Sequence, residues 1–105
     1  MNELQKLIND ISDWAESQFP NQPTLSKCKH LEKEAKELSE AMSNIWRGEA
    51  KTELADCFML LLNIASRLKL DASGVIQIIR VKLEINKSRK WGKPDENGVV
   101  EHIEE

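Results

Sequence analysis

The chain has 105 residues, which is enough for one small domain. Its net charge of -3 gives no general attraction for nucleic acid or an anionic membrane, so we expect neither as a partner. No apolar run approaches the ~20 residues of a membrane span, and the start MNELQKLIND lacks a secretory signal pattern. Two cysteines cannot build a disulfide framework, so we expect a reducing compartment, the cytoplasm.

Helix-breaking residues divide the chain into four expected helices. The first runs from about residue 2 to 17, with apolar residues at i, i+3, i+4 and i+7. The second begins near Thr24 or Ser26, either of which is a suitable cap, and runs to about residue 47 before Gly48.

The third and fourth helices follow from the same pattern. The third spans about 51–70 and the fourth, capped by Asp71, runs to about residue 90. Apolar residues cover well over half of the third helix, whereas a surface helix needs an apolar stripe of only about 100°. We therefore expect it at the centre of a bundle that a second copy completes.

These elements predict an all-α fold, a helical bundle of about four helices in a single domain over 1–105. The helical core covers 1–90 and a turn-rich tail covers 91–105. Because small domains bury a limited fraction of their surface, we expect a homodimer or a homotetramer.

Acidic pairs lie on the second and third helices, at or beside the apolar faces that we expect to pack in the core. Glu34 and Glu37 are three residues apart, so they share a face, and Glu53 and Asp56 repeat the arrangement. If the helices pack side by side, four carboxylates converge and repel one another. A divalent cation removes that conflict, and hard oxygen ligands favour Mg²⁺, with Mn²⁺ as an alternative.

The competing interpretation is that these acids lie on solvated faces. With 18 acids in the chain, pairs such as Asp10 with Asp13 also have this spacing. Two features favour the metal site: Glu34 interrupts an apolar stripe, and the Glu53 pair lies on a helix with almost no polar face.

The fourth helix carries cations where its apolar stripe would continue. Lys82, Asn86 and Arg89 line up at i, i+4 and i+7. The helix dipole favours Lys and Arg near a helix end, but it does not account for this alignment. Beside a carboxylate cluster, such a stripe is suited to binding nucleotide phosphates.

The motifs together resemble the signature of the MazG-like, all-α nucleoside triphosphate pyrophosphohydrolases. They run in the order Glu34-x-x-Glu37, Glu53-x-x-Asp56 and Lys82-x-x-x-Asn86-x-x-Arg89. The resemblance covers about residues 25–91, and the ending RKWGKPDENGVVEHIEE is similar to small phage and bacterial members, some acting on purine deoxynucleotides.

The resemblance implies a Mg²⁺-dependent enzyme that hydrolyses a (d)NTP to the (d)NMP and pyrophosphate. It implies a metal site of Glu34, Glu37, Glu53 and Asp56, with Glu37 and Glu53 as catalytic candidates. Lys82, Asn86 and Arg89 would then contact the substrate. Many relatives carry a further Glu at the position of Lys33, which leaves the number of metal ions and the general base open.

Aromatic side chains are the candidates for stacking on the base. They are Trp14, Phe19, Trp46 and Trp91. We favour core packing for Trp14, and we expect Trp91, directly after the cation stripe, to lie near the nucleotide. The alternative function is a non-catalytic helical oligomerisation or regulatory module that retains the family fold.

Overall fold

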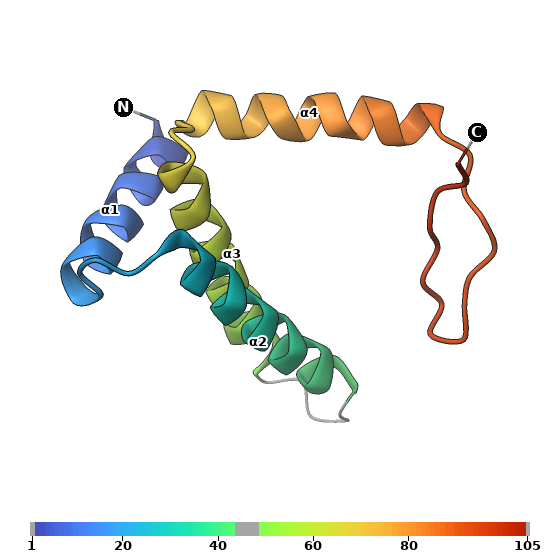
Figure 1. Ribbon diagram of the computed structural model, residues 1–105, viewed down its shortest axis with the longest axis horizontal. Helices are drawn as coiled ribbons and strands as arrows, with labels where there is room; N and C mark the ends of the chain where they lie inside the picture. The colour runs from blue at the N-terminus through green and yellow to red at the C-terminus, as the bar shows by residue number, and fades with distance from the viewer. Residues whose placement is uncertain (1, 44–48, 105) are drawn as a thin grey trace. The chain divides into compact units, whose positions relative to one another are not determined.

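The computed structural model describes residues 2–43 and 49–104. These residues form four helices, α1 (Glu3–Gln18), α2 (Thr24–Ser43), α3 (Ala50–Arg67) and α4 (Ala72–Ser88) (Figure 1). The all-α prediction is therefore confirmed for the described part of the chain. The predicted roles of Trp46 and Gly48 lie outside the described residues.

The chain divides into two compact units, Met1–Ala72 and Ser73–Glu105. In the first unit, α3 packs against both α2 and α1, and α2 and α3 run side by side (Figure 1). The central position that the sequence predicts for α3 is thus confirmed within this unit. None of the described helices is long and apolar enough to cross a membrane.

Local interactions explain where α1 begins. Asn2 caps the helix, since its side-chain oxygen accepts a hydrogen bond from the Gln5 backbone N–H at 2.7 Å. The Gln5 side chain also accepts one from the Ala72 backbone N–H at 2.7 Å. This contact joins the start of α1 to the segment after α3, and α4 begins directly after Asp71, the predicted cap.

The beginning of α2 and the end of α3 differ from the sequence-based prediction. Thr24 is the first helical residue rather than the cap, and its hydroxyl accepts a hydrogen bond from the Arg67 guanidinium at 3.2 Å. The predicted capping role of Thr24 or Ser26 is therefore wrong. Helix α3 ends at Arg67 rather than residue 70, because Lys69 adopts a left-handed conformation with φ of 65°.

The core of the first unit is small and built on the predicted apolar face of α1. Ile8, Ile11 and Ala15 are buried at i, i+3 and i+7. Small residues of the other helices are also buried, among them Ala41, Cys57 and Ala65. Small side chains allow close approach of the helices.

The second unit consists of most of α4 and the C-terminal tail. The tail returns on itself, since Trp91 pairs with His102 in an antiparallel bridge (Figure 1). Their rings meet edge to face with centroids 6.1 Å apart. Asp95 closes the turn between them by accepting hydrogen bonds from the backbone N–H groups of Asn97 and Val99. The predicted turn-rich tail is therefore ordered by its own contacts.

Candidate functional site

The acidic pairs of α2 and α3 meet in the first unit. Glu34, Glu37 and Glu53 each place one carboxylate oxygen within 4.8 Å of the other two. Because side chains three residues apart share a helix face, packing α2 on α3 brings both pairs to the same place. Asp56 is not in this group of three, and it lies beside Glu34 in the wall of the adjoining cavity.

The carboxylates of the three glutamates repel one another. Burial and the neighbouring carboxylates of Glu37 and Glu34 raise the pKa of Glu53 to about 7. One side-chain oxygen of Glu34 and one of Glu53 are buried without a hydrogen-bond partner among the described residues. Buried polar atoms are normally paired, so the arrangement fits a ligand that supplies positive charge. Three hard oxygen donors are suited to Mg²⁺ or Mn²⁺.

All four acids act electrostatically on the thiol of Cys57. Burial raises the pKa of this thiol, and the negative charges of the acids raise it further. The carboxylates that act on it are those of Glu34, Asp56, Glu53 and Glu37. Cys57 is buried on α3, as expected of a small core residue.

A histidine lies against the carboxylate group. His30 Nε2 lies 3.1 Å from Glu34 Oε1, one helical turn away on α2. This contact pairs one carboxylate oxygen of Glu34. The other oxygen, Oε2, is the buried one without a hydrogen-bond partner among the described residues. Sequence reasoning missed His30 in this role, although its i, i+4 spacing from Glu34 was a visible signal.

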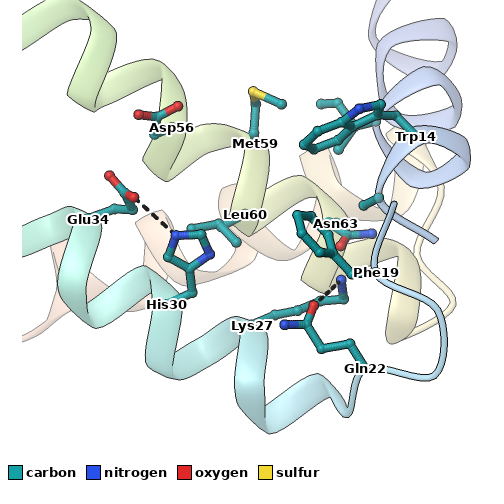
Figure 2. A pocket seen from close by; sticks show the side chains of 12 residues that line it. Trp14, Phe19, Gln22, Lys27, His30, Glu34, Asp56, Met59, Leu60 and Asn63 are labelled. Atoms are coloured by element: carbon teal, nitrogen blue, oxygen red, sulfur yellow. Dashed lines mark hydrogen bonds and ion pairs between the residues drawn. The ribbon is translucent and has the colours of Figure 1, made fainter. Parts of the chain in front are cut away.

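A cavity of about 400 Å³ adjoins the glutamates and is lined by residues of the first unit only. Glu34, Asp56 and His30 lie at one end (Figure 2). Trp14 and Phe19 lie at the other end, where their rings meet edge to face with centroids 5.7 Å apart (Figure 2). The cavity therefore combines an acidic end and an aromatic end.

The exposure of Trp14 corrects a prediction. We expected its side chain in the core, on the apolar face of α1, but 52% of it is exposed. The core position on this face belongs instead to Ala15 and Ile11, and Trp14 lies at the edge beside the cavity. Phe19, at 40% exposed, is placed in the same way by the end of α1.

Two further cavity residues escaped the sequence analysis. Lys27 is 2% exposed and donates a hydrogen bond from Nζ to Gln22 Oε1 at 3.2 Å. A lysine in the first turn of an amphipathic helix is normally solvated, so its sequence position gave no signal of burial. Asn63, also 2% exposed, was visible on the same line of α3 as Asp56, two turns away.

The predicted substrate-contacting residues lie in the second unit. Lys82 is exposed on α4, and the backbone carbonyl of Asn86 accepts a hydrogen bond from Trp91 Nε1 at 2.9 Å. Arg89 lines a pocket of about 260 Å³ that Lys90 and His102 also line. The carboxylates lie in the first unit, so the predicted substrate contacts stay a prediction. They are Lys82, Asn86, Arg89 and Trp91.

Comparison with known proteins identifies relatives. The model of the dATP/dGTP pyrophosphohydrolase family matches residues 7–105. A curated relative, the dATP/dGTP diphosphohydrolase of cyanophage S-2L, is 40% identical over 57 residues. This match covers 54% of the chain and spans about half of that relative, 50% of its length.

A solved structure resembles the whole chain. It is described as the cyanophage S-2L MazG-like pyrophosphohydrolase bound to dGDP and three catalytic Mn²⁺ ions per active site. The TM-score is 0.75 at 29% identity, over 99% of this chain and 96% of that one. The resemblance predicted from the acidic and cationic motifs is thus confirmed, and the chain belongs to the dATP/dGTP pyrophosphohydrolase family, with a MazG-like all-α fold.

Proposed function

We propose that this protein is a nucleoside triphosphate pyrophosphohydrolase that acts on purine deoxynucleotides. The reaction is dNTP plus water giving dNMP plus pyrophosphate. Membership of the dATP/dGTP pyrophosphohydrolase family supports the reaction, and the dGDP in the cyanophage S-2L structure supports the substrate class. The proposed cofactor is Mg²⁺, with Mn²⁺ as a substitute, since Mn²⁺ is bound in that relative.

The observation that carries the proposal is the group of three glutamates. Glu34, Glu37 and Glu53 present oxygens within 4.8 Å of one another, and two of these residues have a buried oxygen with no hydrogen-bond partner among the described residues. These residues would hold the cation, with Asp56 as the fourth ligand at the cavity wall. When bound, a divalent cation offsets the charge on phosphate oxygens and makes an attacking water more acidic.

The other steps of the reaction are assigned to individual side chains. In the reaction, the water oxygen bonds to the α-phosphorus, and the bond from this phosphorus to the bridging oxygen breaks, which releases pyrophosphate. Glu37 and Glu53 are the candidates for accepting the proton of the water, because their carboxylates lie in the group that would hold the cation. His30 orients Glu34. Lys82, Asn86, Arg89 and Trp91 bind the triphosphate and the adjoining part of the substrate.

We also propose that the protein assembles as a homodimer or homotetramer. Apolar side chains of α3 remain exposed in the single chain, including Leu54 (43%), Phe58 (54%) and Leu61 (47%). A second copy that packs on this face would bury them. Light scattering coupled to gel filtration measures the assembly directly.

The free thiols of Cys28 and Cys57 support the proposed cytoplasmic location.

A panel of substrates tests the proposed function. The purified protein is incubated with each common NTP and dNTP, with Mg²⁺ or with EDTA, and the products are separated by ion exchange. We expect monophosphate and pyrophosphate from dATP and dGTP, and no product in EDTA. Diphosphate with orthophosphate would indicate a different phosphohydrolase. The absence of turnover on every substrate would favour the non-catalytic helical module.

A further inference from the structure

The cavity beside the glutamates has a second polar group, at the end away from them. It consists of Gln22, Lys27 and Asn63, and we call it the Lys27 group. Figure 2 shows these side chains near Phe19, across the cavity from Glu34 and Asp56. A nucleotide with its phosphates at the carboxylates would therefore place its base near the Lys27 group.

The aromatic residues at this end supply affinity for a base without selecting one. Trp14 and Phe19 are half exposed beside the cavity, and their rings lie at 86° to each other. Every base has a π-face, so stacking on an aromatic ring tolerates all of them. Selection among bases therefore requires hydrogen-bonding groups at fixed positions, which the Lys27 group has.

Lys27 is an unusual residue to bury. Its side chain is 2% exposed, and the loss of solvent, with a smaller effect from Arg67, lowers the pKa of its amine. The Glu16 carboxylate acts in the opposite direction and favours the charged form. Lysine has three N–H donors, and the structure pairs one of them, with Gln22. A buried ammonium at a cavity wall is therefore suited to an acceptor on a ligand.

Asn63 adds a second observation that points to a ligand. Its side-chain nitrogen is buried and has no hydrogen-bond partner in the described part of the chain. The Asn63 amide also helps to lower the pKa of the nearby Glu16 carboxyl. A buried donor without a partner is costly unless a ligand or water completes it.

The chemistry of the bases matches these donors. Adenine and guanine share an acceptor at N7 but differ at the six-position, where adenine has an amino group and guanine a carbonyl oxygen. The pyrimidines have no acceptor that corresponds to N7. A fixed cationic donor therefore serves both purines, while the Gln22 amide can accept from the amino group or donate to the carbonyl.

We propose, on the basis of the proposed function, that Lys27 selects purines by donating a hydrogen bond to N7 of the base. Gln22 pairs with the six-position, which makes the site accept both dATP and dGTP. The remaining donor, the Asn63 amide nitrogen, serves a further acceptor on the base or the sugar. Lys27 is thus a specificity-determining residue of the proposed enzyme.

Replacing N7 of the base with a C–H group tests this proposal without altering the protein. We would measure kcat/KM for dGTP and 7-deaza-dGTP, and for dATP and 7-deaza-dATP, with Mg²⁺. Loss of a hydrogen bond from a charged donor predicts that the 7-deaza substrates react about 10- to 100-fold more slowly. Methionine has a side chain of similar length to lysine but no N–H donor. In Lys27→Met, the kcat/KM for each natural substrate divided by that for its 7-deaza analogue should therefore fall close to one.

The matched control is Lys29→Met, on the same helix, where Lys29 forms an exposed ion pair with Glu32 at 3.4 Å. This variant should keep the wild-type ratio. Equal rates for dGTP and 7-deaza-dGTP in the wild type would overturn the inference while the proposed function stands. A ratio that persists in Lys27→Met would also overturn the assignment to Lys27. Failure of the wild type to hydrolyse any dNTP would defeat the proposed function and the inference together.

Discussion

Arg67 at the end of α3 binds Glu16 near the end of α1 through two parallel hydrogen bonds. Nε and Nη2 each donate to a different carboxylate oxygen at 2.6 Å, and Nη1 donates to Thr24 at 3.2 Å. One guanidinium therefore joins three helices, α1, α2 and α3. A bidentate pair fixes orientation as well as distance, which places α1 against α3 at this end.

Replacing Arg67 with Met should lower the free energy of unfolding only modestly, because both side chains of the pair are partly exposed and solvent screens their attraction. The hydrogen bond from Arg67 is the largest effect that lowers the pKa of Glu16. Its stabilisation is therefore present above pH 4.5, the ordinary value, and is lost as the pH falls through the lowered pKa. Urea unfolding at several pH values measures both effects. Arg80→Met, on an exposed position of α4, should leave stability nearly unchanged.

Glu53→Gln should abolish Mg²⁺-dependent turnover and weaken Mn²⁺ binding, because it removes a charged oxygen from the cluster of three. The metal-free variant should be at least as stable as the wild type, since repulsion from Glu34 and Glu37 is relieved. Calorimetric titration with Mn²⁺ and thermal unfolding measure the two effects. The control Glu32→Gln changes an exposed glutamate of α2 and should retain activity. Unchanged Mn²⁺ affinity in Glu53→Gln would contradict the assignment.

The stability of the metal-free protein should depend on pH in the direction set by Glu53. Its pKa is raised from 4.5 to about 7 in the folded state, so the folded protein binds more protons than the unfolded chain between these values. The free energy of unfolding should therefore fall as the pH rises from about 4.5 to 7, and then level off. Denaturant unfolding in EDTA measures this, and Glu53→Gln should flatten the slope. A slope of the opposite sign in the wild type, absent in the variant, would show that the shift is misassigned.

Asp56→Asn tests the fourth acid, which lies at the cavity wall rather than within the group of three. We expect it to abolish Mg²⁺-dependent turnover while circular dichroism shows nearly unchanged helical content, because the substitution preserves shape. Asp10→Asn, on an exposed position of α1, should keep wild-type turnover. Retained activity in Asp56→Asn would remove this residue from the proposed metal site.

The sequence predicted the helices and the acidic motifs because both depend on neighbours along the chain. Apolar spacing marked the face of α1 that carries Ile8 and Ile11, and i, i+3 spacing put Glu34 with Glu37 on one face of α2. The order and spacing of the two acidic pairs and the cationic stripe along the chain also indicated the family. Their convergence was conditional on α2 packing against α3, which the structure shows.

Burial at the cavity was decided by tertiary structure alone. Lys27 is buried and Trp14 is half exposed, the reverse of what their side chains favour. The raised pKa of Glu53 likewise depends on carboxylates that belong to another helix. Helix periodicity determines which side chains share a face, but solvent exclusion and charge are set by atoms of other segments. The acidic pairs were therefore readable in the sequence, whereas the Lys27 group, at the other end of the cavity, was decided by the packing of the helices.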